Sequence, residues 1–99
     1  MNDTDTAEAH GWFVYLLRCR DHSLYAGISL DPERRCREHN QRQSLASRYV
    51  WARRPATLAW QQEVADKSTA LKLEYRLKQL TRKQKEQLLQ DPEGWRQLL

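Results

Sequence analysis

Short apolar runs separated by polar residues indicate that the ordered part of the chain begins with two β-strands. Residues 12–17 and 24–28 are rich in aromatic and branched side chains, and both runs are too short for a typical helix. Asp21 and His22 lie between the two runs, with polar neighbours on either side. The pattern therefore predicts an antiparallel hairpin.

A third run, at residues 56–64, predicts another strand. Pro55 discourages helix at the residue before it, and Asp66-Lys67-Ser68 provides a polar end. Leu58 and Trp60 are expected on the same face, because side chains two positions apart in a strand point the same way. The alternative is a helix, which the propensities of these residues also allow.

Helix-start signals predict the remaining elements. Asp31 caps a first turn in which Pro32 fits the first position, and Thr81 with Gln84 forms a capping box. The expected helices run from 32 to about 43, from Ser44 or Ser47 to Arg53 or Arg54, from Asp66 or Ser68 to about Leu80, from 81 to about 90, and from 93 to 98. The fold class is therefore a small α+β domain in which helices flank a three-stranded, largely antiparallel sheet.

The length of the hairpin loop decides which side chains share a sheet face. A two-residue loop at 21–22 would place Tyr15 and Tyr25 on opposite faces, because faces alternate residue by residue. A three-residue loop, or one bulge, would place both tyrosines and Gly27 on the same face. A shared site for the two tyrosines requires the second arrangement.

Length and composition indicate one domain. The 99 residues are 39% hydrophobic and 30% charged, which is typical of a globular protein with one modest core. Residues 1–11 are polar and acidic and predict a disordered tail before a single domain at 12–99. They lack the features of a signal peptide, and no apolar run is long enough to span a membrane. The expectation is a cytoplasmic protein with no membrane partner.

Positive charge is concentrated in the middle of the chain. The formal net charge is +4, and between positions 34 and 54 seven arginines accompany a single acid, Glu38. Arginine forks match phosphate geometry, so nucleic acid is the expected partner. The alternative is a solvated basic surface without a partner.

Two cysteine-histidine pairs raise the question of a zinc site. Cys19 and His22, and Cys36 and His39, each have two residues between them and provide four candidate ligands. The favoured interpretation is two reduced thiols, because one pair falls in a tight turn and zinc would occupy His39. A zinc-stabilised interaction domain is kept as an alternative.

Five positions resemble the motifs of the GIY-YIG nuclease superfamily, in particular its small stand-alone bacterial YhbQ-like members. The segments 13–15 (FVY) and 25–27 (YAG) are similar to its two name-giving motifs. Arg35 follows Tyr25 by ten positions, as the superfamily's helix arginine does, and His39 lies one turn later. Glu74 stands where members carry a metal-binding glutamate. The resemblance extends from about Trp12 to Leu89.

The resemblance implies a divalent-metal-dependent endonuclease that hydrolyses phosphodiester bonds, with DNA favoured over RNA and with a role in repair or in processing branched or single-stranded DNA. Glu74 would bind one Mg²⁺ or Mn²⁺ ion, and Arg35 would brace the phosphate. Tyr15 or Tyr25 would position and deprotonate water, and His39 is the alternative base or leaving-group donor. These groups are expected to converge, with room for a hydrated cation between Glu74 and Arg35.

Further expectations concern binding and the departures from the family pattern. The residues expected to contact nucleic acid are Arg34, Arg37, Arg48, Arg53, Arg54 and Lys78. Phe13 replaces the first motif glycine, and no asparagine clearly matches the one that larger members carry after the glutamate. From spacing alone, Glu74 would form an ion pair with Lys78 or be plainly exposed. A non-catalytic nucleic-acid-binding module is therefore the runner-up, and a protein partner that supplies specificity is a further expectation.

Overall fold

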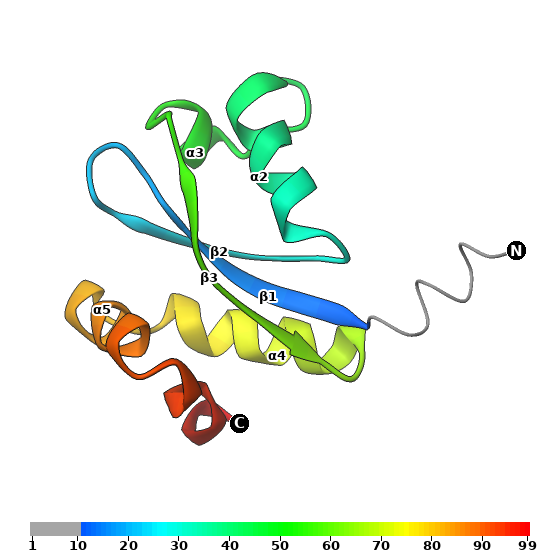
Figure 1. Ribbon diagram of the computed structural model, residues 1–99, viewed down its shortest axis with the longest axis vertical. Helices are drawn as coiled ribbons and strands as arrows, with labels where there is room; N and C mark the ends of the chain where they lie inside the picture. Colours follow the sequence, from blue (N-terminus) through cyan, green and yellow to red (C-terminus); the bar gives the residue numbers. More distant parts are fainter. Residues whose placement is uncertain (1–10) are drawn as a thin grey trace, which may run out of the picture.

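A three-stranded antiparallel sheet lies between two groups of helices in the computed structural model, which describes residues 11–99 (Figure 1). The strands are β1 (Trp12–Arg18), β2 (Leu24–Ser29) and β3 (Thr57–Val64), in the spatial order β2-β1-β3. The helices are α2 (Pro32–Gln41), α3 (Arg48–Trp51), α4 (Lys67–Lys78), α5 (Arg82–Gln90) and the 3₁₀-helix η1 (Pro92–Leu98). The predicted fold class and element order are confirmed. Apart from Gly11, the expected tail at 1–11 lies outside the described residues.

The hairpin between β1 and β2 has a three-residue loop. Backbone hydrogen bonds of 2.9 Å run from Cys19 N–H to Ser23 O and from His22 N–H to Cys19 O, and His22 takes a left-handed conformation at φ 71°. In this register Tyr15 lies opposite Gly27, while Leu17 lies opposite Tyr25. The two tyrosines therefore share a sheet face, as the odd loop predicts.

The third strand is confirmed, but the expectation that Leu58 and Trp60 share a face is wrong. The pairing of β1 with β3 shifts register between Leu16 and Leu17, so that Leu16 lies opposite Trp60 and Leu17 opposite Leu58. Ala59 is the extra residue of a β-bulge. The bulge turns Leu58 and Trp60 to opposite faces, because neighbouring β1 residues face opposite ways.

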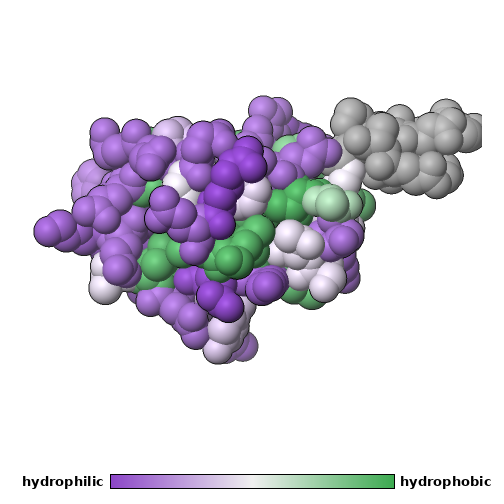
Figure 2. Space-filling model, turned by 90° about the horizontal axis from the view of Figure 1, so that it is seen from below, coloured by the Kyte–Doolittle hydropathy of each residue, from purple (hydrophilic) through white to green (hydrophobic). Residues whose placement is uncertain are grey.

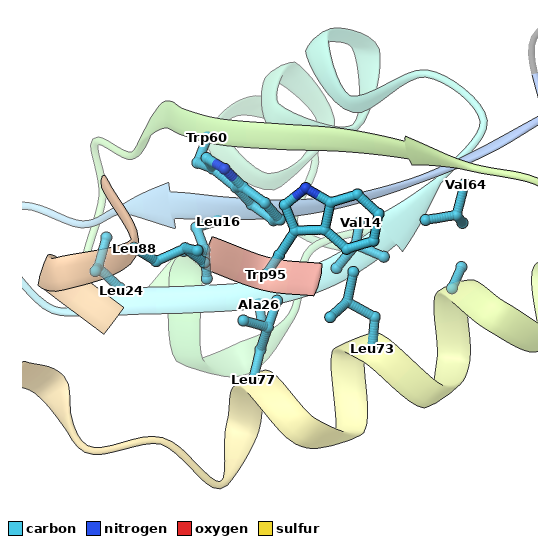
Figure 3. Packing of buried hydrophobic residues seen from close by; sticks show 11 residues of the cluster. Val14, Leu16, Leu24, Ala26, Trp60, Val64, Leu73, Leu77, Leu88 and Trp95 are labelled. Atoms are coloured by element: carbon cyan, nitrogen blue, oxygen red, sulfur yellow. The ribbon is translucent and has the colours of Figure 1, made fainter. Parts of the chain in front are cut away.

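Each face of the sheet therefore has its own core. On one face, Leu73 and Leu77 point from α4 toward the strands, and Trp95 joins them from η1 (Figure 3). The buried residues of this apolar core are Val14, Leu16, Leu24, Ala26, Trp60, Val64, Ala70, Leu73, Leu77, Leu88 and Trp95. On the other face, which α2 and α3 cover, the smaller second core contains Tyr15, Leu17, Cys19, Val50 and Ala56.

Side-chain caps begin the four α-helices where the sequence predicts them. Asp31 and Thr81 cap α2 and α5, and the Thr81–Gln84 capping box is complete. Between the alternatives that the sequence leaves open, Ser47 caps α3 and Asp66 caps α4. Each of these short polar side chains accepts a hydrogen bond from a backbone N–H in the first turn of its helix.

The face of the molecule formed by α4 and the C-terminal segment is mostly hydrophilic, with an apolar band across it (Figure 2). Within residues 11–99, no helix is both long enough and apolar enough to cross a membrane.

Candidate active site

Tyr15 of β1 and Gly27 of β2 are the sheet residues at the centre of the candidate site. They are cross-strand neighbours, and a methyl group placed on Gly27 would lie 2.5 Å from Tyr15 Cζ, far inside van der Waals contact. The absent side chain at position 27 is what allows the Tyr15 ring to cross over β2. Gly27 is thus required for the position of the phenol, in keeping with the close approach that a strand glycine often marks.

His39 of α2 is completely buried above this phenol and is held at both ring nitrogens. Its Nε2 lies 3.2 Å from Tyr15 Oη, and the backbone N–H of Ser47 donates to Nδ1 at 3.1 Å. Because a backbone amide can only donate, Nδ1 must be unprotonated. The hydrogen-bond pattern therefore assigns the proton of the neutral ring to Nε2, from which His39 donates to Tyr15 Oη.

The burial of this pair fixes its protonation. Burial lowers the pKa of His39 to about 4, and the charge of Arg35 acts in the same direction, so the ring is neutral near pH 7. Burial also raises the pKa of Tyr15 far above its ordinary value, with Tyr25 and Glu74 adding to the rise and Arg35 opposing it. The Tyr15 phenol is consequently protonated, and its own proton points away from His39.

Tyr25 is the accessible phenol of the site. Its ring meets His39 edge-on, with centroids 5.6 Å apart, and stacks on Tyr49 of α3 at 5.9 Å and 22°. Lys78 Nζ lies 5.8 Å from the centre of the Tyr25 ring. Within residues 11–99 the Tyr25 hydroxyl makes no hydrogen bond, so it is available to a water molecule or a substrate oxygen.

Arg35 and Glu74 form no ion pair with each other, and each has other partners. Arg35 Nη1 donates to Leu45 O at 2.8 Å and lies 3.2 Å from Glu38 Oε1. The half-buried Glu74 pairs instead with Lys78 at 3.3 Å, which is the i,i+4 alternative that spacing allows. The charges of Arg35 and Glu74 both act on the Tyr15 phenol, as its pKa shows.

The site is located at the β2 edge, where the two helical layers meet. β2 is an outer strand of the sheet, with α2 and α3 on one face and α4 on the other (Figure 1). Lys78 reaches from α4 to the ring of Tyr25, which belongs to the opposite face. At this edge, side chains from the helices on both faces of the sheet can therefore reach the same site.

The model of the GIY-YIG catalytic domain matches residues 11–87 of this chain. The chain belongs to the GIY-YIG family. Among its relatives, the UPF0213 protein of Aeromonas hydrophila is 50% identical over 91% of this chain, and that of Aeromonas salmonicida is 45% identical over 93%. The chain spans only 65% and 66% of the length of these two relatives.

Other relatives of this GIY-YIG protein are matched over most of their length. The UPF0213 protein YhbQ of Escherichia coli is 42% identical over 89% of this chain and 86% of its own. The solution NMR structure of the UPF0213 protein BH0048 from Bacillus halodurans is 34% identical, with a TM-score of 0.51 over 80% of this chain and 82% of that one. The resemblance found in the sequence is confirmed. The family is that of a nuclease-type catalytic domain, whereas the relatives' names state no activity.

The donor set of this GIY-YIG domain limits the metals that it could hold. No three His, Cys, Asp or Glu side chains of residues 11–99 lie close enough together to enclose an ion. Cys19, His22, Cys36 and His39 therefore form no such group, and both ring nitrogens of His39 are engaged in hydrogen bonds, which argues against the zinc alternative. One carboxylate, Glu74, still fits a Mg²⁺ or Mn²⁺ ion that keeps several waters and takes phosphate oxygens as further ligands.

The residues expected to contact nucleic acid differ in how they are held. Arg37 and Arg48 are exposed and have no acidic partner within the described part of the chain. Arg53 pairs with Asp21 at 3.1 Å, and the Arg54 guanidinium lies 3.4 Å from the centre of the Trp51 ring. Arg34 and Lys78 each pair with a glutamate, at 3.6 Å and 3.3 Å.

Sequence reasoning missed Tyr49, Arg82 and Lys85 near the site. Tyr49 continues the stack that begins at Tyr25, and all three line a hollow beside it. The alternation of aromatic residues with arginines at 48–54 is a signal that could have identified Tyr49. Nothing local distinguishes Arg82 or Lys85 from the other basic residues of their helix.

Proposed function

We propose that this GIY-YIG domain is a divalent-metal-dependent endonuclease that hydrolyses phosphodiester bonds in DNA. The observation that carries the proposal is the buried Tyr15–His39 hydrogen bond beneath the accessible Tyr25. His39 and the phenol of Tyr15 are both buried, and Ser47 N–H holds the histidine in one tautomer. Packing a helix on a sheet requires only apolar side chains, and burying polar groups there is costly. Such pre-organised groups beside an arginine and a carboxylate are typical of a catalytic site.

The protonation states divide the work between the two tyrosines. Tyr25 Oη accepts a hydrogen bond from the attacking water and orients it toward phosphorus. His39 keeps its proton on Nε2 and positions Tyr15, so it is a positioning residue rather than the base. The remaining hydroxyl proton of Tyr15 is directed away from His39 and can be donated to an oxygen of the bound phosphate.

Arg35 and Glu74 supply the charge that the phosphate requires. The Arg35 guanidinium, anchored on Leu45 O, braces the negative charge that develops on the phosphate oxygens. Glu74 would hold the Mg²⁺ or Mn²⁺ ion after Lys78 is displaced from its carboxylate. When bound, that ion supplies positive charge against the phosphate oxygens.

One observation favours a second candidate, a nucleic-acid-binding module without catalysis. Glu74 is neutralised by Lys78, and within residues 11–99 it belongs to no group of three or more His, Cys, Asp or Glu side chains that could hold a metal ion. In that case the basic residues bind the backbone, and Glu74 serves only to pair with Lys78. The two candidates differ in a single measurable property, which is metal-dependent cleavage that requires Glu74.

The test is cleavage of single-stranded, duplex and branched DNA and of RNA with Mg²⁺ or Mn²⁺, using the parent and Glu74→Ala. We expect the substitution to abolish cleavage while leaving salt-dependent binding almost unchanged, since it removes no phosphate-contacting cation. Glu93→Ala is the control for the loss of an ion-paired glutamate, because Glu93 pairs with Arg96 at 3.0 Å on the 3₁₀-helix η1. A Glu74→Ala protein that cuts as well as the parent would exclude the metal role.

The finer features of the proposal follow from the surroundings of the site. Repair or processing of branched or single-stranded DNA in the cytoplasm suits a site located at an accessible sheet edge. A protein partner would supply sequence or structure specificity beyond the backbone contacts of the arginines.

A further inference from the structure

The loop that joins α2 to α3 carries one exposed leucine between two exposed arginines. It runs from Arg42 to Ser47 and is followed by Arg48, the first residue of α3. Leu45 lies three positions from each of the two arginines and is 42% exposed. In Figure 1 this loop lies on the side of the sheet opposite α4. We call residues 42–47 the Leu45 loop.

The Leu45 loop is held in place by hydrogen bonds of its backbone. Leu45 N–H donates to Arg42 O at 2.9 Å, and Leu45 O accepts from the Arg35 guanidinium at 2.8 Å. Two positions later, Ser47 N–H donates to His39 Nδ1 at 3.1 Å. The loop is thus attached directly to two residues of the candidate active site. Its leucine is a pre-ordered apolar group beside the arginine that is proposed to brace the phosphate, and pre-ordering reduces the entropy lost on binding.

The arginines on either side of the leucine are available to phosphate. Within residues 11–99, the side chains of Arg42 and Arg48 form no ion pair and no hydrogen bond. Glu38 lies one turn before Arg42, but Arg34 and Arg35 engage its carboxylate at 3.6 Å and 3.2 Å. The two guanidinium groups can therefore bind phosphates without first losing a partner.

Two hollows border the Leu45 loop. One has a volume of about 370 Å³ and is lined by Gln43, Ser44, Ala46, Arg48 and Trp51. The other has a volume of about 280 Å³ and is lined by Arg34, Arg37, Glu38, Gln41 and Arg42. Each is roughly ten times the ~30 Å³ that a water molecule occupies in the liquid. The loop therefore stands between two recesses and is not part of a flat surface.

We propose that the Leu45 loop is an apolar wedge that recognises DNA at a junction between paired and unpaired strands. Leu45 enters a base step at the junction, and Arg42 and Arg48 bind phosphates on either side of that step. The inference rests on the proposed function only in placing the neighbouring phosphate at Arg35.

The combination of groups in this loop, rather than the leucine alone, supports the wedge. A single exposed leucine is ordinary on a protein surface. This one has a fixed backbone, exposed arginines on both sides and the candidate phosphate site next to it. Apolar side chains that separate stacked bases must overcome the cost of unstacking, and that cost is smallest where pairing has already ended. The wedge therefore favours a junction over an uninterrupted duplex.

The test detects binding and unstacking without cleavage, by fluorescence in EDTA. The probes are a DNA fork, in which two strands separate at one junction, and a blunt duplex of the same paired sequence. Each carries 2-aminopurine, an adenine analogue whose fluorescence rises when it is unstacked, placed in turn at the positions next to the junction and at the same positions of the duplex. The parent should bind the fork more tightly than the duplex and should raise the fluorescence at a junction position.

Substitutions of the leucine assign the unstacking to the loop. Leu45→Ala should weaken fork binding by about 5- to 50-fold and remove the fluorescence rise, because less apolar surface enters the base step. Leu45→Met, which stays apolar and keeps a similar volume, should behave like the parent. Leu30→Ala is the matched control, since Leu30 is 43% exposed and precedes the other end of α2. It should change neither quantity.

Substitutions of the arginines test the flanking phosphate contacts. Arg42→Gln and Arg48→Gln should each lower the slope of log Kd against log salt on the fork by about 0.7–0.9, the value for one phosphate contact on a single or a double strand. Lys83→Gln, which removes one positive charge from α5, is the control and should leave the slope unchanged.

The outcomes separate this inference from the proposed function. A Leu45→Ala protein that binds and unstacks the fork as Leu30→Ala does would overturn the wedge, even if the parent cuts DNA in a Glu74-dependent manner. Lower salt slopes from the arginine variants alone would reduce the loop to a backbone contact and overturn it as well. Leu45-dependent unstacking by a protein that never cuts would leave the inference standing and remove the proposed endonuclease.

Discussion

The two faces of β1 pack into different kinds of core, although the residues that enter them alternate along a single strand. Val14 and Leu16 point into the apolar core with α4, α5 and η1. Tyr15, between them, points into a core that includes the buried His39 and the hydrogen bonds that hold it. One face carries the apolar core and the other carries residues of the proposed active site, so substitutions on the two faces should separate folding from function.

Hydrogen bonding sharpens this contrast. Within residues 11–99, the only buried side-chain nitrogen or oxygen without a hydrogen-bond partner is Trp95 Nε1, on the apolar side. Tyr15 and His39, by contrast, satisfy each other, and Ser47 N–H completes the set. Each of these buried nitrogen and oxygen atoms of the polar face therefore has at least one hydrogen-bond partner, which fixes the group in place.

The largest effect on folding is expected on the apolar face. Leu73 is completely buried in α4, and Leu73→Ala should lower the free energy of unfolding by about 2–5 kcal/mol through lost burial and a residual cavity. Urea denaturation measures the loss. Leu71→Ala, two positions away and exposed, is the control and should change stability by less than about 0.5 kcal/mol. Equal losses from the two substitutions would contradict the assignment of this core.

A second effect on folding should depend on pH and come from His39. Its pKa is about 4 in the folded chain against an ordinary 6.5, so between these values the unfolded state binds a proton that the folded state does not. Stability should therefore fall as the pH drops from 6.5 to about 4, by about 3 kcal/mol in total. Denaturation at several pH values measures it. His39→Gln should lack this part of the slope; an unchanged slope would place His39 outside the buried core.

Local chemistry was enough to predict much of the fold. The caps at Asp31 and Thr81 and the polar bounds of the third strand are sequence-local signals, and they identify the elements correctly. A hairpin loop with an odd number of residues is by itself enough to place Tyr15 and Tyr25 on the same sheet face. The bulge at Ala59 could not be read in the same way, since it is set by packing Leu58 and Trp60 into two different cores.

The site could be predicted only in part, for a similar reason. The resemblance selects the residues, but it does not show that Ser47 N–H fixes the tautomer of His39, because that bond joins α2 to the start of α3. Likewise, Arg35 donates to the backbone oxygen of Leu45, which lies in a loop that carries no sequence motif. Contacts that depend on how helices meet require the tertiary structure.

On the polar face, Tyr15→Phe should have a moderate effect on stability. The substitution keeps the ring but removes the oxygen that accepts from His39 Nε2–H, leaving a buried donor unpaired. The expected loss is about 1–3 kcal/mol in the free energy of unfolding, measured by urea denaturation. Tyr75→Phe, at an exposed tyrosine, is the control. A Tyr15→Phe protein as stable as this control would show that the buried hydrogen bond contributes nothing.

The smallest effect on folding, combined with a large effect on activity, is expected at Tyr25. Its hydroxyl makes no hydrogen bond within residues 11–99, and Phe preserves the stacking on Tyr49 and the edge contact with His39. Tyr25→Phe should therefore change the free energy of unfolding by less than about 0.5 kcal/mol. Cleavage should nevertheless fall by about 10²–10⁴-fold, because the group that orients the attacking water is gone. Single-turnover cleavage and urea denaturation of the same preparation test both parts. If Tyr25→Phe cuts like the parent while Tyr15→Phe does not, the roles proposed for the two phenols must be exchanged.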